Sequence, residues 1–237
     1  MRALCFATGN LRQLIGKTDI FKIISSLDVD GIELTLGKDF NERKLQESDE
    51  SVFKNYKHNS IHSPFRFSLK YCSIEEMFQG LEILKDYSKR INSTHIIAHP
   101  VQIFPEDFDK NSSLNFLTEN LNPKKGKDRP RLGYEVALKN NPGLGLCLDV
   151  SHAYDWSINE TDYVVSNWKH RIKQVHFSNN RYHKDHLVFE KVSRSFLKSI
   201  EPLRELNVPI VIEEDMPYSK VNDIKDELKR VKNVLGF

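Results

Sequence analysis

The feature that most constrains the fold of this chain is a series of short apolar runs that end in a histidine or a carboxylate. Six such runs lie at residues 60–62, 94–99, 116–119, 144–149, 172–176 and 208–213. Short aliphatic runs bounded by polar or turn residues are typical of buried strands. Two earlier apolar runs, at 3–7 and 31–36, bring the number of predicted strands to eight.

Helical patterns separate these runs. Residues 73–91 begin with Ser73 and Glu76, which predict a capping box, and continue with apolar side chains at helical spacing. Similar patterns cover residues 18–27, about 190–206 and 219–235. Alternating strands and helices indicate parallel strands with crossover helices. Eight such units in 237 residues fit one α/β domain, a (β/α)8 TIM barrel that spans residues 1–237.

The strand ends carry the residues that we expect to do chemistry. In a TIM barrel the carboxyl ends of the strands meet at one mouth, where catalytic residues collect. Imidazole and carboxylate groups suit zinc, manganese or iron, and a carboxylate can bridge two ions. The pattern therefore predicts a divalent metal site, and the alternative is a barrel rim whose polar residues only cap strand ends. The predicted residues are His62, His99, Glu119, Asp149, His152, His176 and Glu213.

Composition adds exclusions. No apolar run approaches the ~20 residues of a membrane span, and the first predicted strand starts too early to leave room for a signal peptide, so we expect a cytoplasmic protein with no membrane partner. Three cysteines make no disulfide framework. The net charge is +2, and the basic cluster at 124–131 is interpreted as a solvated loop or, alternatively, a phosphate contact.

Several motifs resemble a known superfamily. The segment 145–152, Gly-Leu-Cys-Leu-Asp-Val-Ser-His, is similar to the Gly-x-Cys-x-Asp-Thr-Cys-His signature of AP endonuclease family 2, the endonuclease IV type. Asp30-Gly31-Ile32-Glu33-Leu34 resembles the second-strand motif of sugar isomerases and epimerases. Four strand-end motifs, at 61–64, 97–100, 118–120 and 176–180, resemble those of both branches. Nearly the whole chain therefore resembles xylose isomerase-like TIM barrels.

This resemblance implies a metal site with two ions, most simply zinc, with manganese or magnesium as alternatives. His62, His99 and Glu119 would hold one ion. Glu119, acting as a bridge, would hold the second ion together with Asp149, His176 and Glu213. In the endonuclease pattern a third ion uses His152 and an Asp-x-His pair that precedes Gly-Glu-Gly.

The third site departs from that pattern. If His186 matches the histidine of the pair, Lys184 occupies the aspartate position, and Asp185 serves only by a shift of one residue. An ammonium group repels a divalent ion. We therefore expect no fully occupied ion held by His152 and His186 with Lys184, and we expect His152 to contact substrate or water.

The remaining candidates lie on the predicted loops near the mouth. His183 and Asp185 are further candidate ligands or residues of a polar loop, whereas Arg181 or Lys184 would meet an anionic substrate group. Glu33 is expected to end the second strand and to form a rim salt bridge, with a hydrogen bond to substrate as the alternative. Tyr154 and Trp156, placed on a loop, would stack on substrate or pack that loop on the barrel.

Two reactions compete. Phosphoester hydrolysis of the endonuclease IV type, by metal-activated hydroxide, explains both extra histidines, His62 and His99. Sugar or sugar-phosphate isomerisation or epimerisation needs one ion and two carboxylates, Glu119 and Glu213, as acid and base. Catalytic roles then fall to Glu119, Glu213, Asp149 and His152. The substrate would be a small phosphorylated compound or sugar, or abasic DNA, with no protein partner implied. We favour hydrolysis slightly, and a barrel that binds metal or sugar without turnover is the third option.

Overall fold

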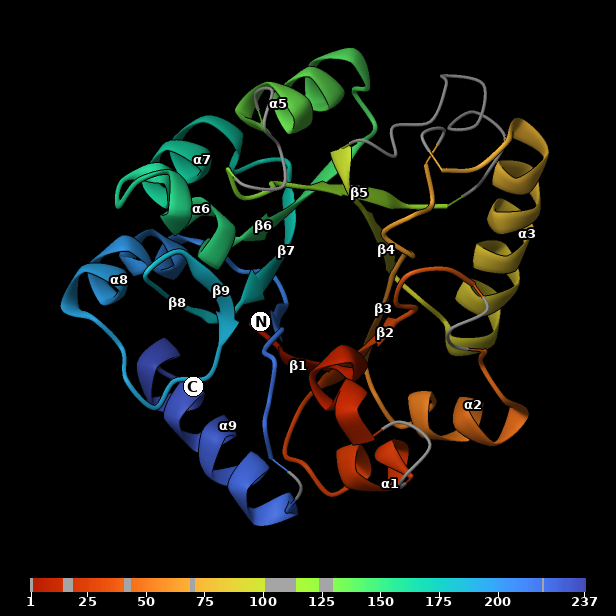
Figure 1. Cartoon of the computed structure of the whole chain (residues 1–237), viewed down its shortest axis with the longest axis horizontal. Coiled ribbons are helices and arrows are strands. Elements are labelled where there is room, and N and C mark those ends of the chain that lie inside the picture. The colour runs from red at the N-terminus through yellow and green to blue at the C-terminus, as the bar shows by residue number, and fades with distance from the viewer. Residues whose placement is uncertain are drawn as a thin grey trace.

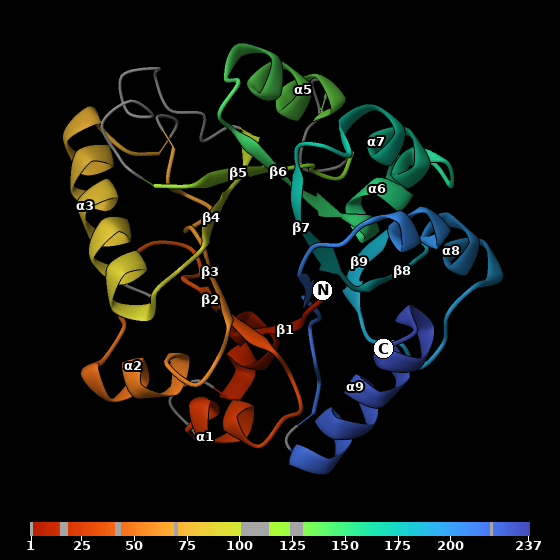
Figure 2. The same cartoon turned by 180° about the vertical axis from the view of Figure 1, so that it is seen from behind.

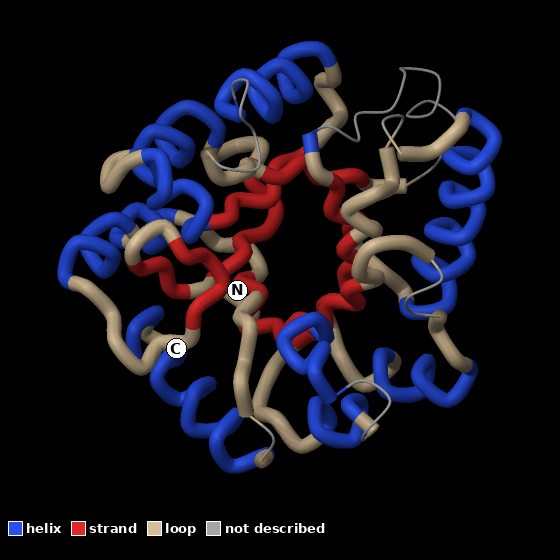
Figure 3. Tube along the Cα trace, viewed as in Figure 1, coloured by secondary structure: helices blue, strands red, loops and turns tan. Residues whose placement is uncertain are grey.

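In the computed structural model, a closed ring of parallel strands forms the centre of the molecule (Figures 1 and 3). The structure describes residues 2–14, 19–40, 44–68, 71–100, 114–123, 130–218 and 220–237. Around the ring the strands follow the order β1-β10-β7-β6-β5-β4-β3-β2. They are β1 (Leu4–Ala7), β2 (Gly31–Thr35), β3 (His58–His62), β4 (His95–Ala98), β5 (Phe116–Glu119), β6 (Gly145–Asp149), β7 (Ile172–Phe177) and β10 (Ile210–Ile212). The (β/α)8 barrel predicted from sequence is confirmed.

Helices surround the ring on its outside, as both views of the cartoon show (Figures 1 and 2). The described helices are η1 (Thr8–Leu14), α1 (Ile20–Ser25), α2 (Glu47–Phe53), α3 (Ile74–Ile91), α5 (Pro130–Asn140), α6 (Val150–Trp156), α7 (Glu160–Trp168), α8 (Arg194–Ser199), η3 (Glu201–Glu205) and α9 (Val221–Leu235). Among them none has the length and hydropathy of a membrane span. The largest group of buried apolar side chains fills the space between strands and helices.

Local sequence explains the best-predicted helix. The Ser73 side chain accepts a hydrogen bond from the Glu76 amide, and the Glu76 carboxylate accepts one from the Ser73 amide, which confirms the capping box of α3. Asn92 ends this helix in the left-handed conformation, with φ 51°.

The sequence predictions for residues 190–206 and for the segment after β7 are wrong. The pattern over 190–206 predicted one helix, but the chain forms two, α8 and then η3. The break comes just before Pro202, the second residue of η3, because proline has no backbone N–H with which to continue α8. The segment after β7 was expected to be a loop, but it forms an antiparallel hairpin of β8 (Asn179–Arg181) and β9 (Lys184–Leu187). The basic segment 124–129 lies outside the described residues.

Candidate metal centre

The carboxyl ends of the strands bring the predicted residues together at one mouth of the barrel. Ligand-type atoms of His62, His99 and Glu119 lie within 4.8 Å of one another, and so do those of Glu119, Asp149, His176 and Glu213. Parallel pairing explains this gathering, because the closed ring brings the carboxyl ends of all eight strands to the same side.

Glu119, the last residue of β5, belongs to both groups. Its Oε2 lies 3.5 Å from His62 Nε2 and 3.3 Å from His99 Nε2. Its Oε1 faces the other way, 3.3 Å from His176 Nδ1, and Glu213 Oε2 lies 2.9 Å from that same nitrogen. The two oxygens of one carboxylate therefore face two different sets of candidate ligands, which is the arrangement of a bridging carboxylate.

Three of the histidines have one ring nitrogen fixed by a backbone acceptor. His62 Nδ1 lies 2.9 Å from the Ser63 carbonyl oxygen, His152 Nδ1 3.0 Å from that of Asn120, and His186 Nδ1 3.1 Å from that of Glu213. A carbonyl oxygen only accepts, so the neutral form of each ring carries its proton on Nδ1 and leaves Nε2 unprotonated.

The unprotonated nitrogens then face carboxylate oxygens. His62 Nε2 faces Glu119 Oε2, and His152 Nε2 lies 3.3 Å from Asp185 Oδ2. Two lone pairs that face each other repel unless a proton or a metal cation lies between them. Glu119 Oε2 and Asp149 Oδ2 are moreover buried without a hydrogen-bond partner in the described part of the chain. These donors fit a divalent cation.

The electrostatics of the metal-free site follow from this crowding. Burial opposes a charge on His62, but Glu119 outweighs burial and raises the pKa of His62 to about 9. Burial also opposes a charge on His176, and its neighbours Cys147, Glu33 and Glu213 raise its pKa well above the ordinary value. The surrounding carboxylates therefore favour the charged form of both imidazoles.

The carboxylates divide into two kinds. Burial would raise the pKa of Glu119, but the imidazoles of His176, His62 and His99 lower it well below its usual range. Burial is the largest cause of the raised pKa of Asp149. A cation is therefore needed most beside Asp149, whose charge its neighbours compensate least.

The hairpin β8–β9 brings His186 to the mouth, where ligand-type atoms of Asp149, His152 and His186 lie within 4.8 Å of one another. Asn179 pairs with Leu187 and Arg181 with Lys184, so the four residues of β9 lie opposite three of β8 and β9 contains one extra residue. His186, within this bulge, has a left-handed φ of 55°. The bulge places Asp185 next to His152, and Asn122 donates a 2.6 Å hydrogen bond to Asp185 Oδ2. Of the two alignments that the sequence left open, the bulge supplies the one-residue shift that Asp185 needs, and Lys184 lies exposed.

The other residues of the hairpin lie apart from this group. His183 is 69% exposed, and its Nδ1 lies 3.3 Å from Asp155 Oδ1, so it does not join His152 and His186. Arg181 and Lys184 are exposed register partners across the turn. Residues Tyr182 and His183 form that turn with φ of 54° and 58°.

The aromatic residues after His152 pack on the protein. Tyr154 and Trp156 lie in helix α6, not on a loop as the sequence suggested. The Tyr154 hydroxyl lies 2.6 Å from Ser195 Oγ, and Trp156 Nε1 donates to the Leu121 carbonyl at 2.9 Å. Tyr154 therefore packs against α8 and Trp156 against the segment after β5, and stacking on a substrate stays a prediction.

Glu33 is the residue that sequence reasoning placed worst. Strand β2 continues to Thr35, and Glu33 lies fully buried inside the barrel instead of at its rim. Its Oε2 lies 3.1 Å from His176 Nε2. The alternation of side chains in a strand could have indicated this position. Gly31, Glu33 and Thr35 share one face of β2, and that face points into the barrel.

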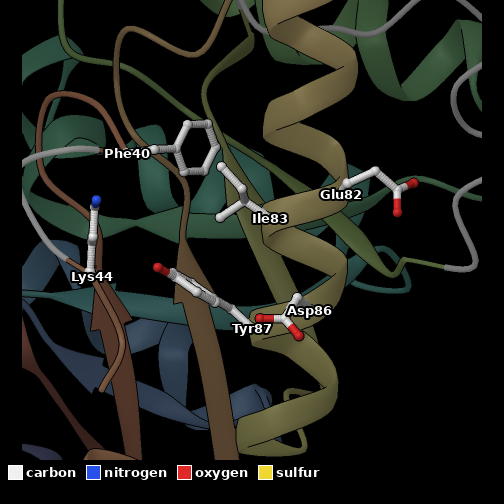
Figure 4. Close-up of a pocket in the computed structure, with 6 residues that line it drawn as sticks. All are labelled: Phe40, Lys44, Glu82, Ile83, Asp86 and Tyr87. Carbon is white, nitrogen blue, oxygen red and sulfur yellow. The ribbon is translucent and has the colours of Figure 1, made fainter. Parts of the chain in front are cut away.

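A surface hollow on the outside of the barrel is a separate feature (Figure 4). It lies between the segment after β2 and helix α3, and it is lined by Phe40, Lys44, Glu82, Ile83, Asp86 and Tyr87. The Tyr87 hydroxyl accepts a hydrogen bond from the Leu45 amide there. This hollow contains none of the predicted site residues.

Comparison with solved structures supports the fold. The chain is 16% identical to a D-tagatose 3-epimerase-like protein, with 99% of this chain and 97% of the other covered and a TM-score of 0.68. A probable 3-DHS dehydratase of Bacillus anthracis, involved in petrobactin synthesis, gives 16% identity, coverage of 98% and 99%, and a TM-score of 0.68. Endonuclease IV of Thermus thermophilus gives 13% identity, coverage of 98% and 99%, and a TM-score of 0.60.

These structures define the fold class of the chain. They are xylose isomerase-like TIM barrels, and the chain has their fold over nearly its whole length. No protein-family model and no curated protein matches the sequence. The resemblance stated from sequence motifs is confirmed at the level of fold.

Proposed function

We propose that this chain is a divalent-metal-dependent phosphoester hydrolase. The observation that carries the proposal is the position of Glu119, whose Oε2 faces His62 and His99 while its Oε1 faces His176. One ion would lie with His62, His99 and Glu119, and another with Glu119, Asp149, His176 and Glu213. Such a pair of ions supplies Lewis acidity and a water of lowered pKa for displacement at phosphorus.

The residues of the chain would support this reaction in distinct ways. Glu119, Asp149 and Glu213 offset cationic charge inside a low-dielectric barrel, and the carbonyl of Ser63 orients His62 through its Nδ1 proton. The hairpin group of His152, Asp185 and His186 could hold a third cation or orient a substrate oxygen. The side chains of this site are held in place before substrate binds, because their hydrogen-bond partners belong to the barrel or to the hairpin that follows β7.

The hairpin turn supports an anionic substrate. Arg181 and Lys184 are opposite each other across β8 and β9, and like charges in that position repel. A phosphate group that both cations contact would relieve the repulsion and gain charge-assisted hydrogen bonds. We therefore infer a phosphorylated substrate, either a small molecule or the phosphate backbone of abasic DNA.

A second function is favoured by a specific observation. Glu119 and Glu213 both lie within 3.3 Å of His176 Nδ1, so one ion at this nitrogen would have a carboxylate on each flank, as sugar epimerisation requires. The fold likeness to a D-tagatose 3-epimerase-like protein agrees with this alternative. Epimerisation with a single ion gives His62 and His99 no role, although both lie beside Glu119. For this reason hydrolysis is preferred.

The decisive experiment combines metal analysis with activity assays. Protein purified without added metal is analysed for zinc, manganese and magnesium, and is then assayed on bis(p-nitrophenyl) phosphate, on an abasic-site duplex and on D-tagatose. We expect two or more zinc ions per chain and phosphodiester cleavage that Glu119→Gln reduces by ~10² or more. A single exchangeable ion with sugar turnover supports the epimerase instead, and a metal-free protein without either activity refutes both reactions.

A further inference from the structure

A layer of side chains lies directly beneath the candidate metal ligands. Successive residues of a strand point to opposite sides, so the residue two positions before each ligand faces the barrel interior as well. Part of this layer is apolar, with Ile97, Leu117 and Cys147 in contact in one cluster and Cys5 and Val211 in another. The remaining part is polar and consists of Glu33, Ser60 and Gln174.

The polar part is organised around a single oxygen atom. Glu33 Oε2 accepts hydrogen bonds from Ser60 Oγ at 2.9 Å and from Gln174 Nε2 at 2.7 Å, and it lies 3.1 Å from His176 Nε2. All four residues are buried. Burying a carboxylate costs desolvation free energy. Packing alone therefore does not explain Glu33, which lies one layer below the rim of the barrel.

His176 differs from the three other histidines whose ring anchors are described. His62, His152 and His186 are each anchored through Nδ1 on a backbone carbonyl. His176 Nε2, its other nitrogen, lies 3.1 Å from Glu33 Oε2 and 3.2 Å from Gln174 Nε2. Gln174 already donates to Glu33 Oε2 at 2.7 Å and the carboxylate only accepts, so a proton on His176 Nε2 satisfies the contact with Glu33. His176 Nδ1 consequently points to Glu213 and Glu119, at 2.9 and 3.3 Å.

We propose that Glu33 is a positioning residue that fixes the Nε2–H tautomer of His176 and thereby presents Nδ1 to a divalent cation. A carboxylate on the second ring nitrogen holds the imidazole plane and increases its basicity as a ligand. Ser60 and Gln174 hold Glu33 in turn, so the support extends from β3 and β7 to β2. This inference rests on the proposed role of His176 as a metal ligand.

The proposal makes the two ions unequal. Glu33 lies in direct contact with His176, which belongs to the group with Asp149 and Glu213, whereas the Glu33 charge is the weakest of the influences on His62. Loss of Glu33 should therefore weaken the ion at His176 much more than the ion at His62 and His99. A residue that merely stabilises the barrel would weaken both ions, because both depend on the same strands.

The test measures zinc affinity by competition with a chromophoric chelator, for zinc alone and without substrate. We expect Glu33→Gln to bind one zinc as the wild type does and to bind the second 10- to 100-fold more weakly, as loss of such supporting carboxylates does. Ser60→Ala should give a smaller loss at the same ion. The matched control is Ile97→Val, which trims the same layer away from His176 and should leave both affinities unchanged.

A second measurement addresses the tautomer itself. In zinc-loaded protein labelled with ¹⁵N-histidine, His176 should show a protonated Nε2 and a metal-bound Nδ1, and the Nε2 proton of Glu33→Gln should exchange faster with water. If Glu33→Gln is poorly folded, Ser60→Ala carries the test, because it removes one support of Glu33 and leaves the carboxylate in place.

The outcomes separate this inference from the proposed function. Wild-type protein that binds no zinc refutes the metal-dependent function. Wild type that binds two ions, with equal affinities in Glu33→Gln, leaves that function standing and overturns the role of Glu33. Equal weakening of both ions, or an equal effect of Ile97→Val, also overturns it, because the effect is then general to the barrel.

Discussion

Asp185 Oδ2 lies 3.3 Å from His152 Nε2, although the two residues belong to a hairpin and a helix that follow different strands. The bulge in β9 makes this contact, because it turns Asp185 and the adjacent His186 toward the same group. In a regular strand consecutive side chains point to opposite faces. Because of the bulge, the neighbouring residues Asp185 and His186 approach His152 from the same side, as the first and third residues of an Asp-x-His pair would in a regular strand.

The first prediction follows from that contact. A crystal soaked in excess zinc should show, besides the two proposed ions, a third and more weakly held ion as an anomalous peak within ~2.0–2.2 Å of His152 and His186, with Asp185 completing the shell. Asp185→Ala should abolish this peak and leave the other ions in place. Lys184→Ala is the matched control and should keep it, because Lys184 is exposed on the hairpin. A peak that persists in Asp185→Ala contradicts the assignment.

The second prediction concerns Asp149, which also caps helix α6. Its Oδ1 accepts a 2.8 Å hydrogen bond from the His152 amide, while its Oδ2 has no hydrogen-bond partner among the described residues. Asp149→Asn keeps a capping oxygen but removes the ligand charge, so metal content should fall with little change in the melting temperature of the metal-free protein. Asp149→Ala should lose the metal and also about 1 kcal/mol of stability. Full metal content in Asp149→Asn would show that Asp149 is not a ligand.

The third prediction separates the two reactions. His62→Ala or His99→Ala removes a neighbour of Glu119 Oε2 and should reduce phosphodiester cleavage by ~10² or more. Under the epimerase alternative these rings only shape the pocket, so sugar turnover would survive with an altered KM. The control is His95→Gln, since His95 begins strand β4 and belongs to neither ligand group. Comparable loss in this control would point to damage to the barrel.

The fourth prediction is a pH dependence of the metal-free protein. The pKa of His62 rises from an ordinary value of 6.5 to about 9 on folding. The folded state therefore binds this proton more tightly than the unfolded state. The resulting stability is fully present below pH 6.5 and is lost as the pH rises toward 9.

Urea unfolding at a pH of about 6.5 and of about 9.5 measures this effect, since the two values bracket the shift. From the shift at His62 alone, the loss should be on the order of 3 kcal/mol at most. His62→Gln should reduce the dependence by the share of His62 and leave that of His176. Zinc binding near pH ~7 should release protons, because a cation replaces them on the histidines, and calorimetry in buffers of different ionisation enthalpy counts them. Stability that rises between these two pH values would contradict the sign.

The barrel and the composition of its mouth follow from local patterns in the sequence. Eight apolar runs separated by helical patterns left parallel pairing as the consistent arrangement, and closure of the ring then brings every strand end to one side. The prediction that His62, Glu119, Asp149 and His176 meet needs only the strand boundaries. Those boundaries are local properties of the chain.

Which atoms face one another depends on how distant parts of the chain pack together. Glu33 and His176 are 143 residues apart, and their contact depends on the radius of the barrel and on the alternation of side chains in two strands. The bulge at Asp185 and His186 needs a left-handed φ at a histidine, which composition does not indicate. Such contacts depend on the register between strands, and register arises only when the whole ring closes.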